Sequence, residues 1–288
     1  MHRSKHHVKE ILMRALFFLC ACISVFCVVI ICYFVLTSGL PAFREIGFAD
    51  FIFGMDWRPS SGVYGIFPMI VGSVYVSGLA MLIGVPLGLA SAVFLAYYCP
   101  KKIYSFAKNA VDLMAGIPSV VYGFFGLVVI VPIMQRVFGT NGKGVLTAAI
   151  ILAIMILPTI TGVCESAMRA VDPAYFEGAL ALGATKESAV FMCASRGARS
   201  GILAGIVLAV GRAIGETMAV VMIAGNQPII PDSVLSGVRT LTSNIILEMG
   251  YATDLHREAL LATAAVLFVF ILLINLSFSL LKRGAKEK

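Results

Sequence analysis

Two charged residues, Arg212 and Glu216, lie inside the apolar stretch GRAIGETMAVVMIAG that runs from Gly211 to Gly225. Arginine stays protonated and presents a planar fork of donors that fits two oxygens of a carboxylate or of another oxyanion. Four residues apart on a helix, the two side chains share one face, so we expect them to pair with each other. An entering anion would then compete with Glu216 for the guanidinium. The alternative is a structural ion pair that fixes the rotation of the helix or holds a partner subunit.

The composition indicates that this stretch lies in a membrane. The chain has 288 residues, of which 60% are hydrophobic and only 13% are charged, and its mean hydropathy is +0.97. Soluble globular proteins are typically about 45–50% apolar and about 25% charged, so an integral membrane protein is predicted. The net charge of +7 comes from basic residues between the apolar runs. Such a distribution is typical of membrane topology rather than of a nucleic-acid surface.

Six apolar spans are long enough to be transmembrane helices, and we predict an all-α fold from them. Most lysines and arginines outside the spans fall on the side that holds both termini, which places the termini in the cytoplasm. Residues 1–14 are then a cytoplasmic segment, 15–66 the first helix with an external loop, 67–282 a core of five helices, and 283–288 a cytoplasmic tail. The predicted spans are Ala15–Leu36, Phe67–Tyr98, Ala115–Met134, Val145–Val163, Gly201–Ala224 and Leu260–Leu281.

Glycine and proline interrupt several of these spans, as in GVPLG at Gly84–Gly88 and GIPSVVYG at Gly116–Gly123. Proline removes a backbone donor, and a bilayer tolerates the break only where protein or a water-filled cavity satisfies the freed groups. The interruptions therefore serve either close packing of the helices or the walls of a translocation path.

The cytoplasmic loop at 165–199 has the signals of two short helices. Asp172 is placed to cap a helix that starts at Pro173, continues to about Leu182 and ends at Gly183. Thr185 is placed to cap the second. A structured loop on a chain without a soluble domain predicts a docking surface for another protein, and the alternative is a surface helix pair without a partner.

Catalytic and metal sites are not predicted. The seven cysteines do not have metal-ligand spacing, and the chain has no G-x-x-x-x-G-K-[ST] phosphate loop. We expect no cofactor bound by this chain, so any ATP and magnesium would act on a partner. A secondary anion transporter would need more ionisable sites within the spans or internal repeats, and it is the weaker alternative.

The loop resembles the coupling loop of ABC-importer permeases, which docks on the ATPase. Its matching residues are Glu177, Gly178, Ala179 and Gly183, although Gly178 replaces the usual alanine. The family pattern continues to a proline, where this chain has Cys193 to Arg196. Three further stretches are similar to the C-type permease subunit of phosphate importers: WRPSSGVYGIFPMIVGSVYVS, AGIPSVVYGFFGLVVIVP and GRAIGETMAVVMIAGN.

The resemblance implies a type I ABC-importer permease in the bacterial inner membrane that is not itself an enzyme. Its partners would be a second, A-type permease, a homodimeric ATPase and an extracytoplasmic phosphate-binding protein. Arg212, Glu216 and Thr217 would lie on the phosphate path, and ATP hydrolysis would take place on the ATPase. Permeases for sulfate or molybdate share this fold, so another oxyanion is the alternative substrate.

Overall fold

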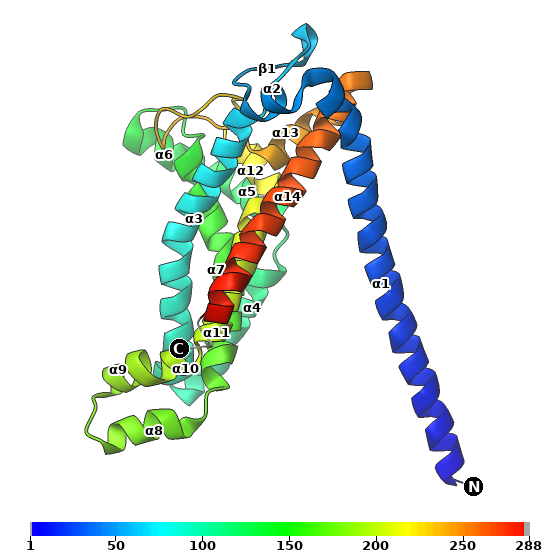
Figure 1. The fold of residues 1–288 in the computed structure, drawn as a ribbon. Coiled ribbons are helices and arrows are strands. Elements are labelled where there is room, and N and C mark those ends of the chain that lie inside the picture. The colour runs from blue at the N-terminus through cyan, green and yellow to red at the C-terminus, as the bar shows by residue number, and fades with distance from the viewer. Residues whose placement is uncertain (1, 285–288) are drawn as a thin grey trace.

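Most of the described residues are helical, and the computed structural model describes residues 2–284. The longest helices run from one end of the molecule to the other, as Figure 1 shows. They are α1 (His2–Ile46), α3 (Phe67–Val93), α7 (Val145–Arg169) and α14 (Asp254–Gly284). An antiparallel hairpin of β1 (Trp57–Arg58) and β2 (Val63–Tyr64) lies at one end, which we call the hairpin end. The predicted all-α fold class is confirmed.

The remaining helices are shorter. Next to the hairpin lie α2 (Phe48–Phe53), the 3₁₀ turn Pro59–Ser61 and α13 (Leu241–Glu248). At the opposite end, which we call the loop end, lie α8 (Pro173–Ala181), α9 (Lys186–Ser188) and α10 (Ser195–Gly197). Between the two ends run α4 (Lys101–Gly116), α5 (Ser119–Phe125), α6 (Val131–Phe138), α11 (Arg199–Gly215) and α12 (Met218–Ile223). Three segments are π-helical, at Phe94–Tyr98, Gly126–Ile130 and Ala189–Ala194.

The predicted spans match the helices in number only when one bent pair is counted. Within residues 2–284, five helices are long and apolar enough to cross a membrane, and a sixth is reached if Lys186–Gly197 and Arg199–Gly215, bent by 74°, form one span. The second span, Phe67–Tyr98, has the predicted limits. The first helix is longer than expected, because α1 already begins at His2. Of the predicted tail 283–288, the part after Gly284 lies outside the described residues.

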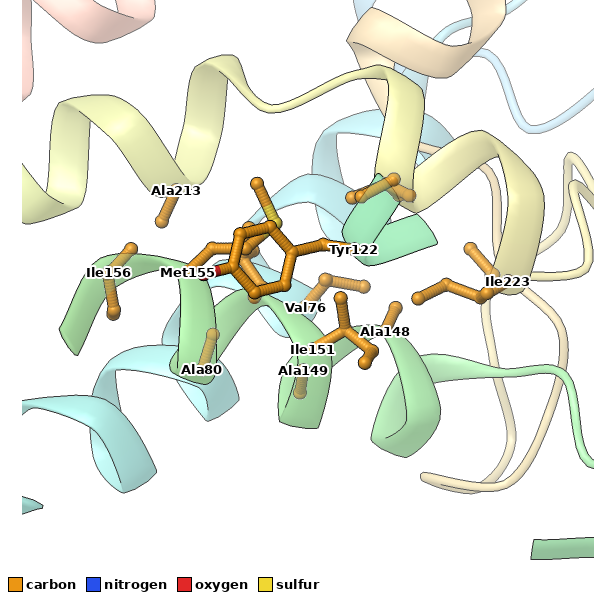
Figure 2. Packing of buried hydrophobic residues seen from close by; sticks show 14 of the residues in the cluster. Val76, Ala80, Tyr122, Ala148, Ala149, Ile151, Met155, Ile156, Ala213 and Ile223 are labelled. Atoms are coloured by element: carbon orange, nitrogen blue, oxygen red, sulfur yellow. The ribbon is translucent and has the colours of Figure 1, made fainter. Parts of the chain in front are cut away.

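Helices α3 and α7 form the centre of the bundle, because glycines let them approach closely. A Cβ atom added at Gly84 would lie 2.8 Å from Ile156 Cδ1, and one at Gly88 would lie 2.8 Å from Ile160 Cβ. Small and branched apolar side chains fill the space between α3, α5, α7, α11 and α12, as Figure 2 shows. Small residues at helix contacts are the usual means of packing helices in a membrane, where lipid already solvates apolar side chains.

Helix α1 stands apart from this bundle over most of its length (Figure 1). It meets α14 near the hairpin end, where a Cβ added at Gly39 would lie 2.8 Å from Ala262 Cα. Toward its N-terminus its large apolar side chains, such as Phe18 and Val25, are exposed. Those side chains need lipid or another subunit around them, which fits a helix in a membrane.

Two helices are broken in the middle of the molecule, and the breaks are adjacent. The chain turns out of the helix at Ile117 between α4 and α5 and again at Glu216 between α11 and α12. The parts beyond the breaks, α5 and α12, pack together so closely that a Cβ at Gly123 would lie 2.8 Å from Ala219 Cα. The Gly-Ile-Pro interruption was expected. The prediction of a single fifth helix over Gly201–Ala224 is wrong, because α11 ends at Gly215.

We expect Gly88→Ala to lower the thermal unfolding midpoint of the detergent-purified chain. Alanine favours a helix over glycine by about 1 kcal/mol, but the added methyl group must displace Ile160, and overpacking costs about 1–3 kcal/mol. Gly78→Ala on the same helix is the control, since no atom lies within 4 Å of its Cβ position. That control should match the wild type or exceed it. Equal midpoints for the two variants would contradict the close contact between α3 and α7.

Candidate functional site

Arg212 lies in the last turn of α11, next to the break, and its side chain reaches α7. Its Nη1 donates a hydrogen bond to Thr159 Oγ1 at 3.1 Å. The guanidinium is also close enough to Tyr122 of α5 to interact with it electrostatically. Sequence analysis missed Thr159, although a threonine directly after Pro158 in an apolar span was a signal for it. The structure therefore places a permanent positive charge where α5, α7 and α11 meet.

Glu216 does not pair with Arg212, and the predicted ion pair is wrong. Among residues 2–284 no salt bridge joins them. The reason is local geometry: Glu216 has extended backbone angles, φ −69° and ψ 128°, so the four-residue spacing no longer puts both side chains on one helix face. Instead Glu216 Oε1 accepts a hydrogen bond from Ala219 N at 3.3 Å and caps the first turn of α12. Thr159 is thus the hydrogen-bond partner that the described residues offer Arg212.

The two breaks keep their backbone groups bonded. Thr217 Oγ1 donates to Gly215 O at 3.1 Å, so this predicted path residue bonds to the chain at the break. Across the other break, Tyr122 Oη donates to Met114 O at 2.9 Å. Beside it lies an apolar hollow of about 270 Å³ lined by Ile117, Val121, Tyr122, Phe125 and Ile154. The two helix breaks and one guanidinium thus lie close together inside an otherwise apolar bundle.

A second charged cluster, which sequence analysis missed, joins α4 to the end of α7. The Glu165 side chain is only 2% exposed and binds Tyr104 Oη at 2.6 Å, Arg169 Nε at 2.8 Å and Lys108 Nζ at 3.0 Å. The hydrogen bond to this carboxylate is the main reason that the pKa of Tyr104 is raised. Arg169 Nη2 also donates to Leu95 O at 2.8 Å. In the sequence, the four-residue spacing of Glu165 and Arg169 was the signal for this cluster, since such a pair can meet on one helix face. Residues 165–169 therefore belong to α7, and the loop begins after them.

The loop that follows has the predicted caps. Asp172 Oδ1 accepts from Ala174 N at 2.9 Å, and Thr185 Oγ1 accepts from Ser188 N at 3.3 Å. Gly183 takes φ +86°, a value that favours glycine after a helix. The second helical stretch is longer than the predicted short helix, because α9, the π-helical segment and α10 follow each other from Lys186 to Gly197 without a proline.

The first half of the loop presents apolar side chains to the outside. Leu182 is 91% exposed and Tyr175 is 63% exposed. Among the residues carried over from the family pattern, Glu177, Gly178 and Gly183 are exposed and Ala179 is half-buried. Exposed leucine and tyrosine beside a conformationally special glycine form the kind of protruding patch that docks on another protein.

Nothing in the described part of the chain resembles a metal centre, since no group of three or more His, Cys, Asp or Glu side chains is arranged to hold an ion.

Comparison with known proteins gives the same architecture. A family model described as binding-protein-dependent transport system inner membrane component matches residues 84–287. The chain is 36% identical over 285 residues to the probable ABC transporter permease protein YqgH of Bacillus subtilis, covering 95% of this chain and 92% of the relative. It is 36% identical over 254 residues to the phosphate transport system permease protein PstC of Mesorhizobium japonicum, covering 81% and 77%.

A solved structure is similar over nearly the whole fold. It is a chain of a bacterial alginate ABC transporter in complex with an alginate pentasaccharide-bound periplasmic protein, with a TM-score of 0.64, 18% identity and 96% of each chain covered. At this identity the likeness concerns the fold, which is that of type I ABC-importer permeases.

We expect Glu165→Gln to destabilise the chain, because it leaves Lys108 and Arg169 without their shared carboxylate. Removing one partner of a buried ion pair costs about 3–5 kcal/mol, and the partial exposure of both cations reduces this to about 1–3 kcal/mol. Asp112→Asn is the control, since Asp112 also contacts Lys108, at 3.6 Å, but is 60% exposed. Thermal unfolding in detergent should show a clear loss for the first variant only. Similar midpoints would contradict a stabilising role for Glu165.

Proposed function

Since the chain belongs to the family of binding-protein-dependent transport system inner membrane components, we propose that it forms the inorganic phosphate path of an ATP-driven importer. The family consists of transport components rather than enzymes, and this chain is a multi-pass membrane protein with the type I permease fold. The observation that carries the proposal is Arg212, a guanidinium at a helix break inside the bundle whose hydrogen-bond partner there is a neutral hydroxyl.

The geometry supports phosphate binding at Arg212. A charge within a membrane bundle is costly, so it is usually kept for a function such as a substrate pathway. Thr159 uses one donor of Arg212, and the planar fork retains other N–H groups for the oxygens of an oxyanion. Glu216 is held at the start of α12, so an anion need not displace a carboxylate to reach the guanidinium. The relatives that carry the name phosphate transport system permease support phosphate as the substrate.

The proposed importer has further subunits, each supported by a feature of this chain or its relatives. An A-type permease would complete the path and cover part of the apolar surface of α1. A homodimeric ATPase, which would bind ATP and magnesium, would dock on the loop around Glu177 and Leu182. An extracytoplasmic phosphate-binding protein would deliver the anion at the hairpin end, and the similar alginate transporter is in complex with a periplasmic protein. The bacterial inner membrane, with both termini and the loop end in the cytoplasm, is the proposed location.

We expect proteoliposomes that contain the assembled transporter to take up phosphate in preference to sulfate or molybdate when ATP is present. Arg212→Gln should lower phosphate uptake by roughly tenfold or more, because a hydrogen bond to a charged group is lost. Arg212→Lys keeps the charge but not the fork, so it should recover only part of the rate. Uptake of labelled oxyanions at equal transporter content measures all three.

Arg14→Gln is the matched control for charge, since Arg14 lies exposed on α1, outside the helix breaks, the hairpin and the cytoplasmic loop. Its uptake should equal that of the wild type. Preference for sulfate or molybdate would overturn the assignment of phosphate as the substrate but would leave the permease assignment intact. Uptake without ATP would favour a secondary transporter. Full phosphate uptake by Arg212→Gln would remove this residue from the path.

We also expect Leu182→Asp to weaken the ATPase contact by roughly tenfold, because it would bury an unpaired carboxylate in an apolar contact. Val63→Asp, at an exposed apolar position in the hairpin, is the control. The amount of ATPase that co-purifies with the permease measures the contact. Equal recovery with both variants would place the docking surface elsewhere.

A further inference from the structure

Helix α13 connects the hairpin end of the molecule to the break at Glu216. Its first turn reaches the break, where Thr242 Oγ1 donates to Glu216 O at 3.2 Å. Its last residue, Glu248, lies among side chains of the hairpin end. Eight residues of helix span about 12 Å. A short rigid element thus has one end at the proposed phosphate site and the other beside the outer surface.

The Glu248 carboxylate fixes the outer end of α13 to three other segments. Its oxygens bind Trp57 Nε1 of β1 at 2.9 Å, Arg239 Nη1 at 2.6 Å and His256 Nε2 of α14 at 2.8 Å. The side chain of Glu248 is only 8% exposed. A pocket of about 530 Å³ opens beside it, lined by residues of the hairpin and of the start of α14. Movement of the hairpin against α14 must therefore move α13, since breaking a buried carboxylate network is costly.

The inner end of α13 is fixed equally well. Leu241 N donates to Ser73 Oγ of α3 at 2.9 Å, and the Thr240 side chain caps the helix by accepting from Ser243 N at 3.2 Å. The Thr242 hydroxyl also lies 3.0 Å from Thr240 Oγ1, whose proton has a second acceptor in Ser243 Oγ at 2.8 Å. The contact from Thr242 to Glu216 O is the one that touches the break. It uses the carbonyl that Glu216 would otherwise offer to a continuous helix, and so it favours the broken form.

Two buried atoms around Arg239 have no hydrogen-bond partner among the described residues. They are Asn244 Nδ2, on α13, and Asn226 Oδ1, just after α12. Arg239 binds both asparagines, through Asn244 Oδ1 and Asn226 O, each at 3.0 Å. An unpaired buried donor and an unpaired buried acceptor both cost free energy. An arrangement of α13 and α12 in which the two atoms meet would recover that free energy.

We infer that α13 controls the break, and that Thr242 is a positioning residue that holds Glu216 away from Arg212. In the broken form Arg212 can accept an anion. When α13 shifts and Thr242 releases the carbonyl, α11 continues through Glu216, and the four-residue spacing then lets the carboxylate pair with Arg212 and expel the anion. A partner that docks at the hairpin end would drive this change through Glu248. The inference rests on the proposed function, because it takes Arg212 as the anion contact.

The test is a double-mutant cycle between Thr242 and Glu216 in the assembled transporter in proteoliposomes. Thr242→Val should lower uptake about fivefold, the factor that corresponds to one lost neutral hydrogen bond. If the loss comes from pairing of Glu216 with Arg212, it should disappear when the carboxylate is removed. Thr242→Val should then have no further effect in a Glu216→Gln background. Glu248→Gln should act like Thr242→Val and show the same dependence.

Thr263→Val is the matched control, because Thr263 is a fully buried threonine whose hydroxyl, among residues 2–284, bonds to Ala259 O of its own helix. Its uptake should equal that of the wild type. Hydrogen exchange gives a second readout: amides around residues 215–219 should exchange more slowly in Thr242→Val than in Thr263→Val, as the helix becomes continuous. Co-purification of the other subunits confirms that each variant assembles.

Two outcomes would overturn the inference. One is that Thr242→Val behaves like Thr263→Val in both uptake and hydrogen exchange. The other is that the losses from Thr242→Val and Glu216→Gln multiply as for independent sites. The cycle is measured with whichever oxyanion the transporter prefers. If the phosphate assignment is wrong, the oxyanion preference of the wild type shows it. If the role of α13 is wrong, only the double-mutant cycle shows it.

Discussion

The structure depends on one constraint: inside a bilayer each backbone carbonyl and amide must find a partner within the protein. Helices α4 and α11 both end near the middle of the bundle, and side chains take over the bonds that the helices lose. Tyr122 binds Met114 O, Thr217 binds Gly215 O and Thr242 binds Glu216 O. A side-chain hydroxyl therefore binds a carbonyl at each break. That is why the chain can expose a charge in the bundle without unfolding around it.

Three carboxylates of the chain differ in how deeply they are buried and in how many partners they have. Glu165 at the loop end and Glu248 at the hairpin end each receive three side-chain donors and are almost fully buried. Such networks fix helices to each other. Glu216 differs, because among the described residues its side chain accepts one hydrogen bond, from a backbone amide. Under the proposed function this weakly held carboxylate is the one that changes partners during transport.

The arrangement also connects the two ends of the molecule. The Glu165 cluster joins α4 and α7 directly before the loop that we propose as the ATPase contact. The Glu248 cluster joins the hairpin, α13 and α14 on the opposite side. The break at Glu216 lies between them and contacts α13 through Thr242. Packed helices thus lie between each end and the break.

The sequence by itself determined the membrane class, most of the spans and the caps of the loop, because these follow from local composition and from interactions between residues close in the chain. Asp172, Gly183 and Thr185 are examples, whereas the choice of Arg212 as the anion contact stays a prediction from its residue type. Tertiary structure alone decided what that charge touches. Whether Arg212 meets Glu216, four residues away, or Thr159, far away in the chain, depends on whether α11 continues. That is set by contacts from α13 and α5, and no local pattern records them.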